Sequence, residues 1–113
     1  MISEQLSFLP DSLPDSHPFP PARERTVWNA LPQRVKDRFL KAGEAALAAA
    51  IAPLPLSLWL DFSHTGRRTA WEDAYFSRRA RLCALVCAEC VEHTGRFLDA
   101  IADTVWAICE ESA

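Results

Sequence analysis

Residues 69–94 read TAWEDAYFSRRARLCALVCAECVEHT, and this stretch contains neither proline nor glycine. A run of this length without a helix breaker predicts one continuous helix of ~37 Å, at a rise of about 1.5 Å per residue. Its start fits a capping box, in which the Thr69 hydroxyl accepts from the third helical N–H and Glu72 reaches back to the Thr69 N–H. The stretch therefore predicts a long helix that begins at Thr69.

Apolar side chains occupy more than one face of this predicted helix. One face carries Trp71, Tyr75, Leu82 and Val86, and another carries Phe76, Cys83, Cys87 and Cys90. A helix that is apolar on several sides is usually buried between other helices. Gly95 is the expected terminator, because glycine readily adopts the left-handed conformation that closes many helices. A last helix should begin at about Phe97 and return antiparallel to the first. Its apolar stripe is formed by Phe97, Ile101, Val105 and Ile108.

Further helical signals precede the long helix. Residues 22–30 predict a short helix. Pro32 is placed to open a better one, because a proline in the first helical turn lacks only an N–H that had no partner there. The apolar stripe of this second helix is Val35, Phe39, Ala42, Ala46 and Ala49, and Pro53 and Pro55 end it. Residues 56–62 are apolar and fit either an extended crossing segment or a short helix.

The first part of the chain is rich in proline. Five prolines lie between residues 10 and 21, namely Pro10, Pro14, Pro18, Pro20 and Pro21. Each lacks an N–H and restricts the residue before it, so an extended arm is predicted here, with one or two helical turns at residues 3–9. We therefore divide the chain into a Pro-rich arm with a short helix, residues 1–31, and an all-α domain of antiparallel helical hairpins, residues 32–113.

Composition argues against several function classes. The formal net charge is -3, so the chain lacks the basic excess with which proteins neutralise nucleic-acid phosphates or anionic membranes. Residues 1–10 contain Glu4 and lack the basic start and apolar run of a secretory signal. No stretch approaches the roughly 20 apolar residues that a membrane span needs. We therefore expect a cytoplasmic protein whose four cysteines are thiols.

The cysteines are the first candidates for a metal site. Cys83, Cys87 and Cys90 are spaced by four and three residues and share one helix face, and Cys109 returns on the next helix. Zinc binding or a disulfide is conceivable from this spacing. Structural zinc sites, however, usually place closely spaced cysteines on turns, where the thiolates converge tetrahedrally. Free cysteine is also among the most buried residue types. We therefore interpret all four as small core thiols and expect neither a metal nor a cofactor.

Arginines crowd the start of the long helix, at Arg67, Arg68, Arg78, Arg79 and Arg81. Such a cluster can hold the carboxylates or sulfates of an acidic sugar by bidentate hydrogen bonds. The alternative is a solvated face, or ion pairs with Asp61, Glu72, Asp73 and Glu89, with Arg78 drawn into a buried pair. Aromatic residues can add a stacking surface, although at helical spacing they are more often part of a core. The candidates for substrate binding are Arg67, Arg68, Trp71, Arg78 and Trp59.

No catalytic constellation is visible in the sequence. His17, His64 and His93 have no nucleophile or carboxylate partner in a recognisable pattern. The sequence also lacks a phosphate-binding glycine loop, a serine nucleophile motif and a metal-binding His-Glu helix motif. We therefore assign no catalytic residue.

Several segments of the second half resemble the start of bacterial heparinase II/III-like proteins. They are TGRR at 65–68, WEDAYFSRR at 71–79, AECVE at 88–92, GRFLDAI at 95–101 and WAICEES at 106–112. The likeness covers roughly residues 35–112 and is densest from Gly66 onward. It implies that the chain is an incomplete α/α-toroid segment. It also implies that the parent enzyme is a polysaccharide lyase acting on acidic, uronate-containing saccharides by β-elimination.

The resemblance further implies that the catalytic residues of the family lie further along the toroid than this chain reaches. The expected role of the chain is then structural, as one wall of the substrate cleft. The competing hypothesis is a standalone helical module, derived from such an enzyme, that binds a protein partner. In both cases an incomplete toroid should expose apolar helix faces and form a homo-oligomer through them.

Overall fold

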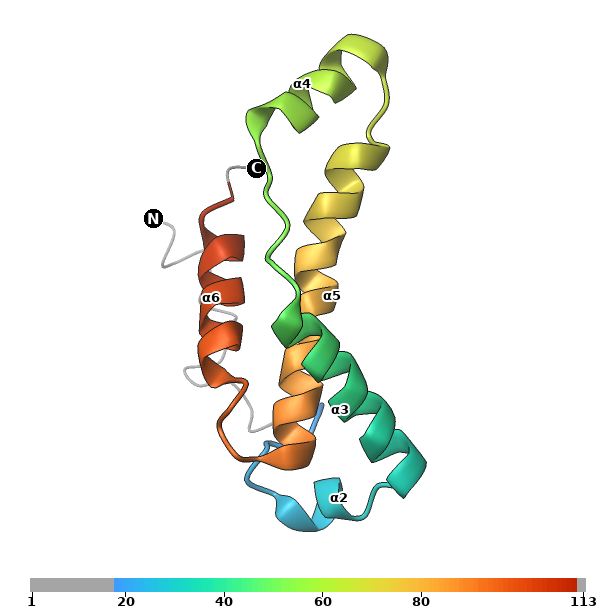
Figure 1. The fold of residues 1–113 in the computed structure, drawn as a ribbon, viewed down its shortest axis with the longest axis vertical. Coiled ribbons are helices and arrows are strands. Elements are labelled where there is room, and N and C mark those ends of the chain that lie inside the picture. The colour runs from blue at the N-terminus through green and yellow to red at the C-terminus, as the bar shows by residue number, and fades with distance from the viewer. Residues whose placement is uncertain (1–17, 112–113) are drawn as a thin grey trace, which may run out of the picture.

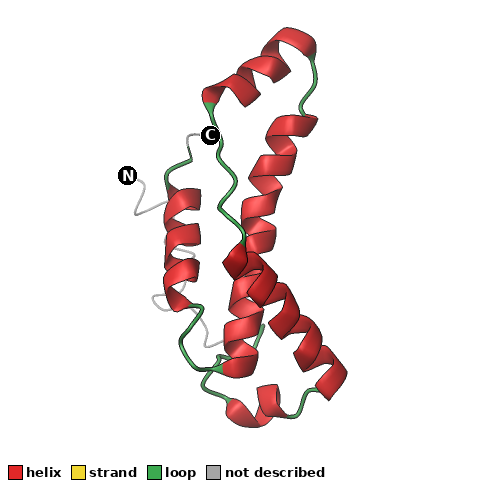
Figure 2. Cartoon of the chain, in the orientation of Figure 1, coloured by secondary structure: helices red, strands yellow, loops and turns green. Residues whose placement is uncertain are grey.

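The described part of the chain is built from helices and loops. The structure, a computed structural model, describes residues 18–111. Its helices are α2 (Arg25–Asn29), α3 (Gln33–Ala48), α4 (Leu56–Thr65), α5 (Thr69–Glu92) and α6 (Leu98–Cys109) (Figure 1). No strand occurs within residues 18–111 (Figure 2), so the all-α prediction is confirmed for this part. The turns predicted at residues 3–9 lie outside the described residues, as do residues 10–17 of the arm predicted at residues 10–21.

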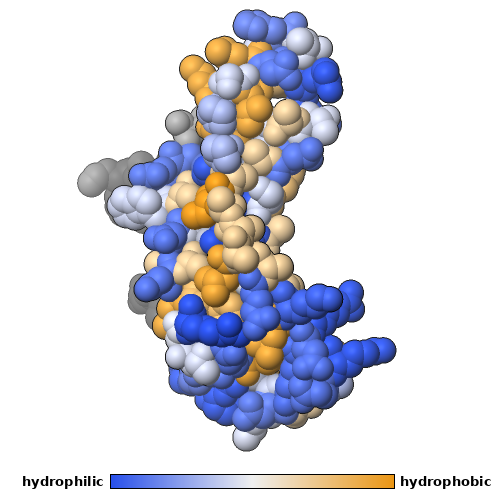
Figure 3. All heavy atoms as spheres, in the orientation of Figure 1, coloured by the Kyte–Doolittle hydropathy of each residue, from blue (hydrophilic) through white to orange (hydrophobic). Residues whose placement is uncertain are grey.

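Helix α5 is the axis of the fold. Helix α3 crosses α5, α6 runs back beside it, and α4 lies at its N-terminal end (Figure 1). The short helix α2 sits at the opposite end, near the C-terminus of α5. Figure 3 shows hydrophilic side chains gathered at the end formed by α2 and α3, and apolar ones along the middle and on one side of α4, whose outer edge is hydrophilic. The visible apolar surface therefore runs along the middle of the molecule and onto α4.

The buried core lies where α3 and α6 meet α5. It consists of Leu85, Ala88, Phe97 and Ala100, with Leu40, Ala46 and Ile101 packed against them. Gly43 is the buried residue of α3. A Cβ atom at Gly43 would lie 2.2 Å from the Cβ atom of Ala88, well inside contact distance. The missing side chain of Gly43 is therefore what lets the backbones of α3 and α5 approach each other closely.

Two apolar stripes are shifted from their predicted positions. On α3, Ala42 and Ala49 are exposed, and Gly43 takes the buried position between α3 and α5. On α6, Val105 is exposed and Thr104 is fully buried. The Thr104 hydroxyl donates to the carbonyl oxygen one turn earlier at 2.7 Å. Because that bond satisfies the hydroxyl, a polar residue can occupy a core position.

The capping box predicted at Thr69 is wrong. Helix α5 does begin at Thr69, but Arg68 before it has helical dihedral angles and no side chain caps the helix. The Glu72 carboxylate pairs instead with the Arg68 guanidinium, with 3.1 Å between Oε1 and Nε. A capping serine or threonine needs an extended backbone just outside the helix. Thr69 already lies inside the first turn and cannot meet that requirement.

The end of α5 also differs from the prediction that Gly95 terminates it. The helix ends at Glu92, and His93 takes the left-handed conformation with φ of 57°. Gly95, with φ of 88°, lies in the loop that follows. The buried Glu89 carboxylate accepts from the backbone N–H groups of Gly95 at 2.7 Å and Phe97 at 3.3 Å. A side chain of α5 therefore fixes the loop that leads into α6.

Prolines set the ends of α3 and the start of α4. Pro32 precedes the first turn of α3 as its N-cap residue. Helix α3 ends at Ala48, and an extended segment containing Pro53 leads to Pro55. Residues 56–65 then form α4, so the segment that the sequence left open between extended and helical structure is a helix.

Candidate functional site

An open groove lies between α4 and the C-terminal end of α6. Its volume is about 680 Å³, within the range of about 300–1,000 Å³ that is common for ligand sites. Helix α5 contributes to it between the other two helices. The groove is lined by Leu54, Pro55, Leu56, Trp59, Trp71, Arg78, Ala107, Glu110 and Glu111. It exceeds in volume the neighbouring hollow beside Arg68 and is our candidate for binding.

Aromatic rings form a continuous row from α4 onto α5. Trp59 and Trp71 meet edge to face, with centroids 5.5 Å apart, and Trp71 stacks on Tyr75 at 4.6 Å. Phe62 adds a ring 5.6 Å from Trp59, and the Arg79 guanidinium carbon lies 3.4 Å from the centre of the Tyr75 ring. Such ring pairs stabilise a fold by more than the burial of their apolar area alone would. The row therefore fixes α4 against α5 and holds Trp59 and Trp71 at the groove.

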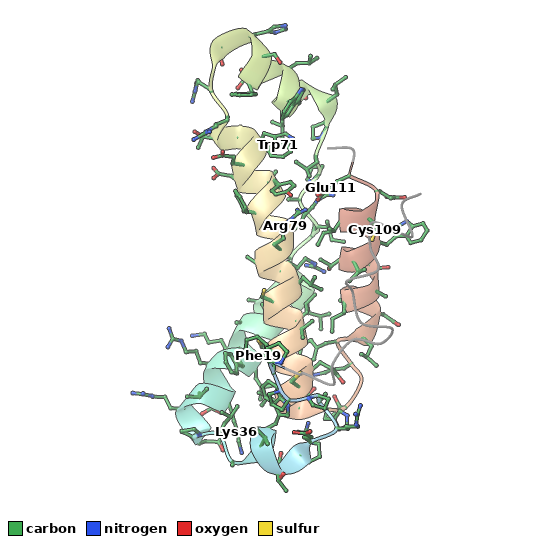
Figure 4. All side chains as sticks on the ribbon, turned by 180° about the vertical axis from the view of Figure 1, so that it is seen from behind. Phe19, Lys36, Trp71, Arg79, Cys109 and Glu111 are labelled. Carbon is green, nitrogen blue, oxygen red and sulfur yellow. The ribbon has the colours of Figure 1, made fainter. Side chains whose placement is uncertain are left out.

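Glu111 ties the end of the chain after α6 to two arginines of α5. Its Oε1 atom lies 3.2 Å from Arg78 Nη1, and its Oε2 atom lies 2.7 Å from Arg79 Nη2 (Figure 4). The side chains of Arg78 and Glu111 are each only 11% exposed. The hydrogen bond from Arg79, assisted by the charges of both arginines, holds the pKa of the Glu111 carboxyl below its ordinary value. The same hydrogen bond raises the pKa of Arg79.

Arg78 is largely occupied by acceptors of the protein itself. Its Nε atom donates to the Ala52 carbonyl at 2.8 Å, and Nη1 donates to the Ala107 carbonyl at 2.9 Å as well as to Glu111. The residues lining the groove include no serine, cysteine, histidine or lysine. The arrangement can therefore hold a ligand between apolar walls, with the carboxylates of Glu110 and Glu111 and the guanidinium of Arg78 as its charged groups.

Of the five candidate substrate-binding residues, the structure brings three into one site. Trp59, Trp71 and Arg78 all line the groove. Arg68 lies beside a neighbouring hollow of about 190 Å³, which it shares with both tryptophans, Phe62 and Glu72. Arg67 is exposed and lines neither hollow. Two acidic residues, Glu110 and Glu111, line the groove without being candidates from the sequence, because the predicted antiparallel return of the last helix does not fix which side chains beyond its end reach α5.

Arginine side chains donate hydrogen bonds to backbone carbonyls at the C-terminal ends of three helices. Arg25 donates to two carbonyls at the end of α5, Arg81 to two at the end of α3 and Arg78 to one at the end of α6. The acceptors are the carbonyl oxygens of Cys90, Val91, Ala46, Ala49 and Ala107. The last carbonyls of a helix have no partner within it and attract positive charge. These contacts leave no signal in the sequence, because the acceptors are backbone atoms of distant segments.

The ion pairs expected of the arginines form only in part. Arg68 pairs with Glu72, and Arg78 enters a buried pair as predicted, although with Glu111. Arg81 reaches the Thr104 hydroxyl at 3.0 Å and backbone carbonyls instead of a carboxylate. The cluster is therefore mainly a set of links between helices, not a free cationic surface.

The four cysteines are all free thiols. Cys83 and Cys109 are exposed, which differs from the core position predicted for them. Cys87 and Cys90 are half-buried, and burial raises the pKa of both thiols, with a smaller contribution from the neighbouring cysteine on the same face. A raised pKa lowers the fraction of reactive thiolate.

The histidines that the structure describes lie outside the groove. His64 lies in α4 and His93 caps α5, both exposed and outside the groove, while His17 lies outside the described residues. Residues 18–111 contain no group of three or more His, Cys, Asp or Glu side chains placed to hold a metal ion. Within the same residues, no helix is both long and apolar enough to span a membrane.

Comparisons with known proteins add no family. No protein-family model matches the chain, and no curated protein matches it. The function of the chain is therefore inferred from its groove and its exposed surfaces.

Proposed function

We propose that this chain is a helical protein-interaction module that binds an apolar segment of a partner polypeptide in the groove between α4, α5 and α6. The observation that carries the proposal is the groove lining. Leu54, Pro55 and Leu56 form one side, and the aromatic faces of Trp59 and Trp71 lie beside them. Apolar and aromatic walls with a few fixed polar groups are typical of sites that bury apolar side chains.

The charges of the groove support a neutral ligand over a polyanion. Glu111 neutralises part of the charge of Arg78 and Arg79, and Glu110 adds a negative charge at the rim. Glu110 also accepts from the Trp106 indole N–H at 2.8 Å. An anionic saccharide entering here would meet two carboxylates and an arginine whose Nε and Nη1 atoms already donate to acceptors of the protein. An apolar side chain would displace only water from the apolar walls.

A second candidate function follows from the resemblance to heparinase II/III-like lyases. In that case the chain is a segment of such an enzyme, and the groove is one wall of a cleft for acidic saccharides. The edge-to-face pair of Trp59 and Trp71, beside the 70% exposed side chain of Arg68, supports this alternative. Aromatic faces stack on sugars, and an exposed guanidinium can bind a sugar carboxylate.

Two probes separate these functions. A phage-displayed peptide library is selected on the purified chain, and enriched peptides are titrated while tryptophan fluorescence is followed. We expect peptides with large apolar residues whose affinity falls at least tenfold in Trp59→Ala. The matched control is Phe19→Ala, because Phe19 is 78% exposed and is not among the residues that line the groove.

An unsulfated oligouronate and a heparin oligosaccharide are titrated in parallel. The proposal predicts no change that depends on Trp59 or Arg68. Saccharide binding that is lost in both Trp59→Ala and Arg68→Ala, without any peptide that depends on Trp59, would replace the interaction module with the saccharide cleft.

A further inference from the structure

Helix α6 has a second apolar stripe that faces away from α5. Leu98, Val105 and Trp106 on this stripe are 55%, 42% and 68% exposed. Ala102 and Cys109 are exposed on the same side. The stripe consists of Leu98, Ala102, Val105, Trp106 and Cys109, which is the spacing of one face of a helix. Its inner face, with Ala100 and Thr104, is already buried against the core.

The edge of this stripe is acidic. Asp99, Asp103 and Glu110 follow it along α6, and α6 contains no lysine or arginine. A partner must therefore combine an apolar or small-residue surface with basic side chains at its edge.

Helix α3 carries a face with the required chemistry. Arg34, Arg38, Lys41, Ala45 and Ala48 are all exposed and recur at spacings of four, three, four and three. They lie opposite Gly43, the residue that α3 buries against α5. The first half of this face is basic and the second half is small and apolar. Figure 4 shows Cys109, at the end of α6, and Lys36, near the start of α3, on opposite sides of α5.

We propose that the outer stripe of α6 in one copy packs along the outer face of α3 in a second copy, with the two helices parallel. A single alignment of the two parallel helices pairs residues along the whole face, because the residue numbers within each pair differ by nearly the same amount. Its pairs are Asp99 with Arg38, Asp103 with Lys41, Trp106 with Ala45 and Cys109 with Ala48. The acidic half of α6 then meets the basic half of α3, and the large indole lies on small alanines.

The contact joins two different faces, so each copy keeps one α3 face and one α6 face free. Such heterologous contacts extend into longer assemblies or close into a ring. None of the four paired residues of α6 lines the groove, so this inference does not rest on the proposed function.

Sedimentation velocity of the full chain, over a wide concentration range, tests the proposal. We expect reversible association in the wild type and a shift to monomer in Trp106→Glu. Asp103→Lys and Lys41→Asp should each weaken association on the order of tenfold, because like charges then face each other. The double variant Asp103→Lys/Lys41→Asp should recover association. Asp73→Lys, a charge reversal on the exposed surface of α5, is the matched control and should change little.

Circular dichroism confirms that each variant is folded before it is compared. A chain that stays monomeric at all concentrations would overturn the proposal and leave the α6 stripe to another protein. Association that survives Trp106→Glu but is lost in Trp59→Ala would also overturn it, and would place the contact at the groove. Failure of the double charge exchange to restore association would reject the register.

Discussion

The Glu89 carboxylate accepts a hydrogen bond from the backbone N–H of Gly95 at 2.7 Å, inside a turn that joins α5 to α6. The same carboxylate accepts from the Phe97 N–H at 3.3 Å. Glu89 is buried, and Phe97 begins the part of the core that α6 contributes. One side chain therefore sets the direction in which α6 leaves α5.

Removing this carboxylate should destabilise the fold. Glu89→Ala leaves two N–H groups without their acceptor, so we expect a loss of about 1–3 kcal/mol in the free energy of unfolding. Urea denaturation followed by circular dichroism measures it. Glu92→Ala is the matched control, because Glu92 pairs with Arg96 at the surface, and exposed pairs contribute little. Equal effects of the two substitutions would show that Glu89 does not organise the turn.

Gly43→Ala should be destabilising, against the usual trend. Within a helix, glycine to alanine ordinarily stabilises by about 1 kcal/mol. Here the new Cβ would meet the Ala88 Cβ atom at 2.2 Å, so α3 must move away from α5. We expect a net loss of about 1–3 kcal/mol from this overpacking. The double variant Gly43→Ala/Ala88→Gly should lose less than the sum of the two single variants, and simple additivity would contradict the close approach.

The sequence is informative where the chemistry is local. The stretch without breakers from Thr69, the prolines at 53 and 55 and the terminator signals near residue 95 predict the helices to within a few residues. Which residue at the helix end becomes left-handed is not local, because the Glu89 carboxylate fixes Gly95 in the loop and leaves His93 to close α5.

The candidate site also combines features that the sequence predicts with features that it does not. Trp59 and Trp71 can each be predicted as a binding candidate, because aromatic residues provide stacking surfaces, but their edge-to-face contact depends on how α4 packs on α5. The partners of the arginines are not predictable, because backbone carbonyls at helix ends look alike in every sequence. The apolar pattern assigns Ala42 and not Gly43 to the buried stripe of α3, because a glycine has no side chain to give an apolar signal. The absence of that side chain is nevertheless what allows α3 to cross α5 closely.

Stability should fall in acid through the Glu111 pair. The pKa of Glu111 is below its ordinary value of 4.5, chiefly because of the hydrogen bond from Arg79. A carboxyl whose pKa is lowered by folding stabilises the fold fully above its unfolded pKa, and that contribution is lost as the pH falls through the folded pKa. Urea titrations between pH 7 and pH 3 should show this loss in the wild type. The slope should be smaller in Glu111→Gln, which has no such proton to bind, and an unchanged slope would contradict the assignment.

Thiol labelling should separate the cysteines into two classes. Cys83 and Cys109 are exposed, whereas burial raises the pKa of Cys87 and Cys90. Because the thiolate is the reacting species, iodoacetamide at neutral pH should modify Cys83 and Cys109 on the order of ten times faster in protein diluted to its monomer. Peptide mass spectrometry of timed samples measures each rate. In denaturant the four rates should converge, and fast labelling of Cys87 in the folded chain would rule out its burial.

The guanidinium of Arg81 should stabilise the fold through neutral acceptors and not through ion pairs. It donates to the Thr104 hydroxyl at 3.0 Å and to the carbonyls of Ala46 and Ala49, so it links α5 to α6 and to the end of α3. Lysine keeps the charge but cannot reach both sides at once, because its donors share one nitrogen. Arg81→Lys should therefore cost about 1–3 kcal/mol in the free energy of unfolding.

The loss should be the same in low and high salt, because screening acts on pairs of charges. Arg23→Lys, at an exposed position, is the matched control and should change little. A loss that shrinks strongly in salt would mean that Arg81 acts through a carboxylate instead.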